Sequence, residues 1–360
     1  MKALRIHAGP VALRHLREQG LRPDDVGVVP GAAGGPKGLI LGPLDRFLFG
    51  QWLPRSSQPI DLVGASIGAW RMATACLNDP VAAFERLEHD YIHQHYELPP
   101  GRKRPTAEQV SREFGQNLHA FYDGRIGEVL GHPRYRLHIV TSRGRHLLGR
   151  EGAARTPLGY LGAFVANTLH RKALGAWLER VVFSGPGAGA PLPFGTGDFR
   201  TRQVPLTEAN FRPALQASCS IPFVLQAIHD IPGAPRGAYW DGGITDYHLH
   251  LDYGTPKAAG LVLYPHFQKS VVPGWLDKGL RWRHRATHFL DRMVVLAPDP
   301  EWVRRLPNGK LPDRTDFTHY GMDWRARASA WGAAASASQQ LADEWQAWLD
   351  KPDPGRVTPL

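Results

Sequence analysis

Cysteine and long apolar stretches are both scarce in this sequence. Only Cys76 and Cys219 occur among 360 residues, so a disulfide framework is excluded, and no CxxC pair or Cys/His cluster predicts zinc. No run approaches the ~20 consecutive apolar residues that a membrane-spanning helix needs. Residues 1–20 carry charges every few positions and lack the apolar segment of a secretory signal. These absences predict a globular protein of the cytoplasm.

Positive charge exceeds negative charge. The chain has 43 Lys and Arg against 33 Asp and Glu, a net charge of +10, and 42% of its residues are hydrophobic, which is ample for a core. A basic surface favours anionic partners, so we expect contact with anionic membrane surfaces; a merely Arg-rich composition is the alternative. The densest basic run, residues 102–104, is too short to predict a nucleic-acid site.

Apolar runs alternate with helical patterns along the chain. Strand-like runs at 26–29 and 60–63 flank a glycine loop and a helix, and a further helix follows at 69–77. This order is typical of a βαβ unit in a parallel sheet. More strands are predicted at 137–141, 181–183, 239–240, 261–264 and 293–296. We expect one α/β domain over 1–360, with a helical cap or insert within 80–200 and a C-terminal helix over 322–349 packed on the core.

The first candidate for chemistry is the Gly-x-Ser-x-Gly pattern at 64–68. Its serine, Ser66, follows a strand-like run and precedes a helical pattern, the setting of a nucleophile elbow. Gly64 and Gly68 relieve crowding beside the serine in such a turn. The alternative is an ordinary strand-to-helix turn with a capping serine.

A glycine-rich loop lies 32 residues before this serine, about one crossover away. The backbone N–H groups of Gly34 and Gly35 are candidate oxyanion donors above Ser66, and Lys37 adds positive potential. A phosphate-binding loop has glycine before its lysine and serine or threonine after it. Here Lys37 stands between Pro36 and Gly38, so nucleotide binding by this route is excluded.

The third candidate is Asp241, which ends a strand-like run and is followed by Gly242 and Gly243. Two glycines after an acidic residue suit close backbone approach to another loop. The alternative is an Asp-Gly hairpin turn.

Together these segments resemble the patatin-like phospholipase family. The glycine loop (33–38), Gly-x-Ser-x-Gly (64–68), Ala-Ser-x-x-x-Pro (217–222) and Asp-Gly-Gly (241–243) occur in the family's order, across residues 25 to 250. The family implies a three-layer α/β sandwich with a central, mostly parallel sheet, helices on both faces and a helical insert. It also implies hydrolysis of lipid esters without a metal or cofactor.

Carried onto this chain, the resemblance implies that Ser66 is the nucleophile and Asp241 the base. It places the oxyanion hole at Gly34, Gly35 and Ile67. The motif residues that support them are Lys37, Gly38, Gly64, Gly68, Gly242 and Gly243. Two positions depart from the family pattern: Ala33 replaces the first glycine, and Lys37 stands where the family usually has arginine.

Two other readings stay open. An α/β-hydrolase esterase would need a histidine, for which Asp299 or Asp316 with His319 are candidates, although no HGGG-type loop occurs. The second alternative is a catalytically inactive relative of the family that binds lipid but does not hydrolyse it. His89 and His93, with His95 nearby, have metal-ligand spacing but predict a solvated helix face better. Within the insert, Phe164, Trp177 and Leu178 are candidate acyl-chain contacts or plain core residues.

Overall fold

A single sheet runs through the molecule. The structure is a computed structural model that describes residues 1–98, 101–102, 104–189, 191–254 and 260–360, so Lys103 of the basic run lies outside the described residues. Its strands are β1 (Leu4–Ala8), β2 (Val26–Gly31), β3 (Ile60–Ala65), β4 (Tyr135–Gly144), β5 (Leu178–Ser184), β6 (Thr201–Pro205), β7 (Ile228–His229), β8 (Ala238–Asp241), β9 (Leu261–Pro265), β10 (Met293–Pro298) and β11 (Val357–Pro359).

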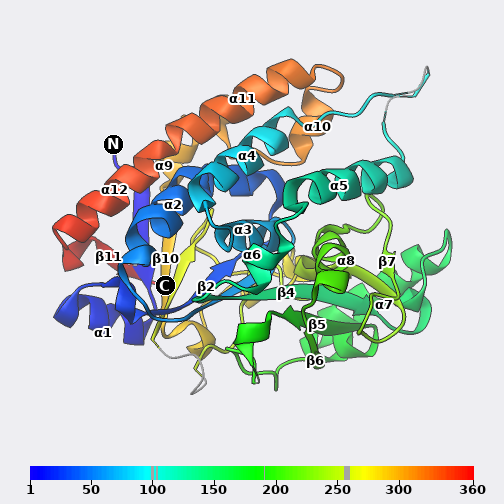
Figure 1. Cartoon of the computed structure of the whole chain (residues 1–360), viewed down its shortest axis with the longest axis horizontal. Helices are drawn as coiled ribbons and strands as arrows, with labels where there is room; N and C mark the ends of the chain where they lie inside the picture. The colour runs from blue at the N-terminus through cyan, green and yellow to red at the C-terminus, as the bar shows by residue number, and fades with distance from the viewer. Residues whose placement is uncertain (99–100, 103, 190, 255–259) are drawn as a thin grey trace.

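Helices separate most of these strands along the chain. The α-helices are α1 (Pro10–Gln19), α2 (Gly42–Phe47), α3 (Ile67–Ala75), α4 (Pro80–His93), α5 (Ala107–Tyr122), α6 (Ile126–Leu130), α7 (Arg155–Leu169), α8 (Glu208–Cys219), α9 (Pro300–Val303), α10 (Thr315–His319), α11 (Trp324–Ala337) and α12 (Gln339–Asp350). In Figure 1, α2, α4, α11 and α12 lie above the sheet, α1 lies at the lower left and α7 lies at the right, beside β4 and β5. Among the described residues, no helix is long and apolar enough to cross a bilayer.

The sheet is mixed but parallel at its centre. Its order is β11-β1-β10-β9-β2-β3-β4-β5-β6, and β8 adds to β4 and β7. The neighbouring strands β10, β9, β2, β3 and β4 are parallel, while β1 and β5 join them antiparallel at either side. The central strands β3 and β10 are buried along their whole length, as strands covered on both faces must be. The predicted α/β fold with a mostly parallel sheet is confirmed.

The segment 80–200 forms more than helices. It supplies helices α4 to α7, but also β4 and β5, which pair with each other over seven residues in the sheet. Helix α7 packs with β5 and β8 in a smaller apolar cluster, which includes Leu148, Tyr160, Leu178 and Trp240 and is separate from the main core.

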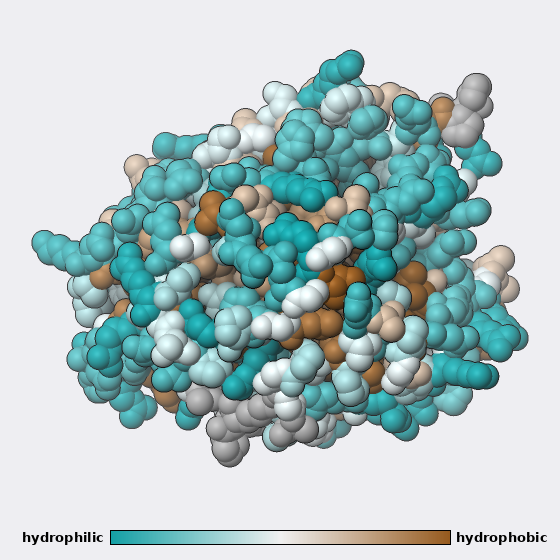
Figure 2. All heavy atoms as spheres, in the orientation of Figure 1, coloured by the Kyte–Doolittle hydropathy of each residue, from teal (hydrophilic) through white to brown (hydrophobic). Residues whose placement is uncertain are grey.

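The C-terminal helix expected over 322–349 is interrupted at Ser338, where α11 gives way to α12. The backbone ψ of Ser338 is −6°, away from the α-helical value, and its Oγ donates to the carbonyl of Ala335 at 2.6 Å. The expectation that this region packs on the core is correct, because Trp331, Trp345 and Trp348 are almost fully buried. Figure 2 shows that the face carrying α2, α4 and α5 is mostly hydrophilic, with apolar residues exposed mainly in one area right of its centre.

Candidate active site

Ser66 occupies a strained turn between β3 and α3. Its φ of 57° and ψ of −131° lie in a region that residues with a Cβ rarely adopt. The strain turns the chain sharply at the carboxyl end of β3, which places the side chain at the edge of the sheet where α/β active sites lie. Gly64 lies two residues before it, where a Cβ would overlap the backbone of Ala69 in the following helix. The predicted strand–elbow–helix arrangement is present.

Strand pairing brings Asp241 to the same place. Strand β3 pairs with β4 as far as Ala65, which lies opposite Val140. From the next residue, Thr141, the strand β8 takes over, with Asp241 opposite Thr141. Because β5 occupies the other edge of β4 here, β8 continues along the edge that β3 leaves. The chain therefore places Ser66 and Asp241 face to face, although they are 175 residues apart in the sequence.

The two side chains are directly hydrogen-bonded. Ser66 Oγ donates to Asp241 Oδ2 at 2.7 Å, and the N–H of Gly243 donates to Asp241 Oδ1 at 2.7 Å. The main chain of Asp241 is also fixed, since its N–H donates to the carbonyl of Ser220 at 2.9 Å. Ser66 is 4% and Asp241 5% exposed. The structure thus brings together the two residues that the sequence suggested as nucleophile and base.

Burial makes Asp241 a stronger base than an ordinary aspartate. Loss of solvation raises its pKa from 3.8 to about 6, while the hydrogen bond from Ser66, the charge of Arg314 and the N–H of Gly243 oppose this shift. The carboxylate is therefore still ionised at neutral pH, and its proton affinity is closer to that of the group it must deprotonate.

Ser218 on α8 holds the turn in place. The N–H of Ser66 donates to Ser218 Oγ at 2.9 Å, and Ser218 Oγ donates in turn to the carbonyl of Val140 at 2.7 Å. This hydroxyl ties the elbow to β4 and occupies the N–H of Ser66. The sequence analysis quoted Ser218 only as part of a motif and gave it no role.

The glycine loop lies against the Asp-Gly-Gly segment. The N–H of Ala33 donates to the carbonyl of Tyr247 at 2.9 Å, and a Cβ on Gly243 would come within 2.6 Å of the Ala33 side chain. Gly34 precedes the 3-10 helix η2 (Gly35–Leu41), and the φ of Gly35 is +57°, which favours glycine.

Three backbone donors near the elbow are free. Within the described residues, no protein acceptor pairs with the N–H groups of Gly34, Gly35 or Ile67. Ile67 follows the serine directly and begins α3, whose N-terminus carries partial positive charge. Uncommitted donors of this kind are what an oxyanion hole requires.

Close backbone contact explains two of the motif glycines. A Cβ on Gly68 would overlap the carbonyl of Gly31, the last residue of β2. A Cβ on Gly242 would overlap the carbonyl of Val140 on β4. Both glycines therefore let neighbouring chain segments meet at the edge of the sheet where Ser66 lies.

Positive side chains surround the loop. Lys37, which precedes Gly38 on η2, is half-buried over the ring of Phe267 at 5.3 Å. Arg314 Nε lies 3.3 Å from where a Cβ on Gly35 would be, and Lys278 lies over the ring of Tyr247 at 4.9 Å. None of the three cations has an ion-pair partner among the described residues. Burial lowers the pKa of both lysines. The charges of Lys310 and Arg314 lower the pKa of Lys37 further, and those of Lys37 and Arg314 lower the pKa of Lys278, while Asp313 opposes both shifts. No pattern in the sequence marked Arg314 or Lys278.

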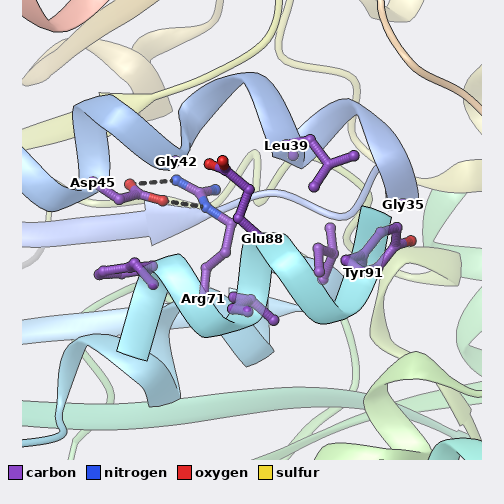
Figure 3. Close-up of a pocket in the computed structure, with 11 residues that line it drawn as sticks. Gly35, Leu39, Gly42, Asp45, Arg71, Glu88 and Tyr91 are labelled. Carbon is purple, nitrogen blue, oxygen red and sulfur yellow. Dashed lines mark hydrogen bonds and ion pairs between the residues drawn. The ribbon is translucent and has the colours of Figure 1, made fainter. Parts of the chain in front are cut away.

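The pocket beside the loop does not contain the Ser66–Asp241 pair. Figure 3 shows Gly35 and Tyr91 at one end and the ion pair of Asp45 and Arg71 at the other. Arg71 donates from Nε and Nη2 to both carboxylate oxygens, at 2.7 Å each. Because Arg71 is on α3 and Asp45 on α2, this buried pair fixes the helix that begins at the elbow.

The alternative triad does not assemble. Asp299 caps α9 and is paired with an arginine of β1 at 2.5 Å, and Asp316 accepts from the indole of Trp331 at 2.8 Å. His319 is exposed and its ring packs on Tyr320. Neither carboxylate bonds His319, and no described histidine bonds the hydroxyl of Ser66.

The remaining candidate residues lie elsewhere. His89, His93 and His95 are exposed on or just after α4, and no group of three metal-ligating side chains forms among the described residues. Leu178 is fully buried in β5 and Trp177 is partly buried against the same apolar cluster, which is the packing of core residues. Phe164, the third candidate acyl-chain contact, lies on α7 and is exposed.

Comparison with known proteins adds little to this geometry. No protein-family model matches the chain, and no curated protein does so either. Among solved structures, VipD from Legionella pneumophila aligns with 95% of this chain and 70% of its own, at 13% sequence identity and a TM-score of 0.37. Similarity this low carries no argument about activity.

Because α3 approaches β2 closely at Gly68, we expect alanine to destabilise the protein at this position but not at an open glycine on α6. Gly68→Ala should lower the free energy of unfolding by about 1–3 kcal/mol, because its Cβ overlaps Gly31. Gly127→Ala on α6, where the new Cβ meets nothing within 4 Å, should be neutral or stabilise by up to about 1 kcal/mol. Urea unfolding measures both, and equal effects would contradict the packing described.

Proposed function

We propose that this protein is a serine acyl hydrolase that cleaves carboxylic esters of lipids through Ser66 and Asp241. The observation that carries the proposal is the 2.7 Å hydrogen bond from the Ser66 hydroxyl to a buried carboxylate, at a strained strand-to-helix turn. A nucleophile in hydrogen-bond contact with its base is the arrangement that activates a serine.

The first half-reaction forms an acyl-enzyme. Asp241 accepts the hydroxyl proton as Ser66 Oγ attacks the ester carbonyl, and the C=O electron pair moves onto the oxygen. Collapse of the tetrahedral intermediate breaks the bond to the alcohol, which leaves with the proton from Asp241. In the second half, water gives its proton to Asp241 and attacks the acyl carbon, and Ser66 recovers its proton as the acid leaves.

The free N–H groups near the elbow supply the electrostatic part of catalysis. Gly34, Gly35 and Ile67 present donors with no protein acceptor among the described residues, on the loop and helix that adjoin Ser66. Each donor that reaches the oxyanion stabilises the transition state by roughly 3–4 kcal/mol. The nearby cations, Lys37 and Arg314, add to the same field.

Lipid esters are the substrate class that the four ordered motifs imply by their resemblance to patatin-like phospholipases. No metal or cofactor takes part in the steps above, because the serine, the carboxylate and the backbone donors supply nucleophile, base and charge stabilisation. The geometry disfavours the histidine triad, since the candidate histidine contacts neither Ser66 nor a carboxylate.

Substitution separates the dyad from the triad. Ser66→Ala and Asp241→Asn should each lower kcat for a soluble p-nitrophenyl ester by at least ~1000-fold, since each removes one half of the proton transfer. His319→Ala should retain the wild-type rate. Circular dichroism checks that each variant is folded. Near-wild-type activity in Asp241→Asn, or its loss in His319→Ala, would refute the dyad.

The raised pKa of Asp241 sets the direction of the pH dependence. Only the ionised carboxylate accepts a proton, and burial favours the neutral form up to about pH 6. We therefore expect kcat/KM for the soluble ester to be level above pH 7 and to fall about tenfold per unit well below pH 6. The His319→Ala variant should show the same limb. A limb centred near pH 4, as for a solvated aspartate, would contradict the burial argument.

A further inference from the structure

The outer face of α7 is apolar yet uncovered. Leu158, Leu161, Phe164, Val165 and Leu169 recur at three- and four-residue spacing, and their exposed fractions range from 45% to 80%. The inner face of the same helix buries its side chains against β5 and β8. An apolar stripe of this kind in contact with water is characteristic of an interaction site.

Neighbouring loops extend the stripe. The ring of Phe223 packs on Tyr160 of α7 with centroids 5.9 Å apart, and the 3-10 helix η9 (Trp275–Asp277) also contacts α7. Arg283 Nη1 donates to the carbonyl of Asn167 at 2.7 Å, which seats the segment around Trp282 at the end of α7. The α7 surface, as we name it, comprises Leu158, Leu161, Phe164, Val165, Leu169, Phe223, Val224, Trp275 and Trp282.

One member of this surface is held outward by a strained backbone. Phe223 has a φ of +68°, which is a true outlier for a bulky residue, and its side chain is 61% exposed. It lies three residues after Ser220, whose carbonyl accepts the N–H of Asp241. Strain that presents an aromatic ring to water next to a catalytic segment indicates a functional role.

Positive charge exceeds negative charge around the α7 surface. Asp277 is buried and paired with Arg171 and Arg283, and Glu151 is an exposed acid near Tyr160. Residues 155–176 and 278–290 contain no Asp or Glu. The exposed cations there are Arg155, Lys172, Lys278, Arg281 and Arg285. Lys278 also lies over the ring of Tyr247, whose carbonyl accepts the N–H of Ala33 in the glycine loop, so this cation links the α7 surface to the site.

We propose that the α7 surface docks the protein onto anionic lipid membranes, with its apolar side chains in the acyl-chain boundary and its cations among the headgroups. The proposal deepens the proposed function, on which it rests, by identifying aggregated anionic lipid as the form in which substrate is met. Tryptophan and phenylalanine on one side with Lys and Arg around them are the composition of interfacial membrane contacts.

A second copy of the chain fits this surface less well than lipid does. In a symmetric dimer through α7, the same cations would face each other, because a two-fold interface pairs a patch with itself. Like charges around an apolar contact oppose such pairing, whereas an anionic headgroup layer complements them.

The test is sedimentation of protein with vesicles of phosphatidylcholine containing phosphatidylglycerol, or of phosphatidylcholine alone. It is done in a Ser66→Ala background, so that no hydrolysis alters the vesicles. The surface variant is Leu161→Gln/Leu169→Gln. The matched control is Val11→Gln, because Val11 is also an exposed apolar residue but lies on α1, at the opposite end of Figure 1.

Ser66→Ala should bind the anionic vesicles and lose binding as salt is raised. The double substitution should lower the partition coefficient by at least about tenfold, and Val11→Gln should leave it unchanged. Thermal unfolding confirms that the variants are folded. Equal binding by all three, binding by none, or a dimer that only the double variant disrupts in gel filtration would overturn the proposal.

The outcomes distinguish this proposal from the proposed function. If Ser66→Ala binds vesicles but the wild type has no esterase activity, the docking proposal stands and the proposed hydrolase function is wrong. If the wild type hydrolyses esters but Ser66→Ala does not bind vesicles, the hydrolase function stands and the docking proposal is wrong.

Discussion

The carboxyl end of β4 is the part of the structure on which the site depends. Three consecutive residues there organise it. The carbonyl of Val140 accepts the hydroxyl of Ser218, which in turn accepts the N–H of Ser66. Thr141 pairs with Asp241, and Ser142 Oγ donates to the carbonyl of Asp241 at 2.9 Å. The nucleophile and the base are therefore positioned from one short stretch of strand, and a shift of register in β4 would separate them.

Glycine makes this convergence possible. The elbow, the glycine loop and the Asp-Gly-Gly segment meet with backbones close enough that a Cβ on Gly68 or Gly242 would overlap a carbonyl. The same closeness removes water from Asp241 and raises its pKa to about 6. Tight packing and base strength thus have one physical cause, and each oxygen of the buried carboxylate accepts a hydrogen bond.

The sequence predicted what is encoded locally. The central strand β10 is a continuous apolar run and β3 is apolar except for Asp61. The elbow and Asp-Gly-Gly segments combine glycine with a reactive residue. These strands and segments are therefore recognisable without a structure. The edge strands β6 and β11 were missed because they are short and mostly solvated, which leaves no apolar pattern. Likewise β1 was not foreseen, since its pairing with β10 joins residues almost 300 positions apart.

Residues that act through contacts distant in sequence could not be predicted. The roles of Ser218 and Arg314 come from strand register and from the position of α10, neither of which a local pattern reports. The kink at Ser338 is similar, because a serine inside a helical pattern is not by itself a break. The exposed stripe of α7 reads in the sequence as a core-facing helix, and only the structure shows which face is uncovered.

The central claim is that Ser66 is the activated nucleophile. Peptide mapping by mass spectrometry after reaction with a fluorophosphonate tests it directly, because this reagent phosphonylates an activated serine. The account predicts one adduct, on the peptide that contains Ser66, formed quickly in the wild type and far more slowly in Asp241→Asn. An adduct on a different residue, or no adduct on a protein that hydrolyses esters, would contradict it.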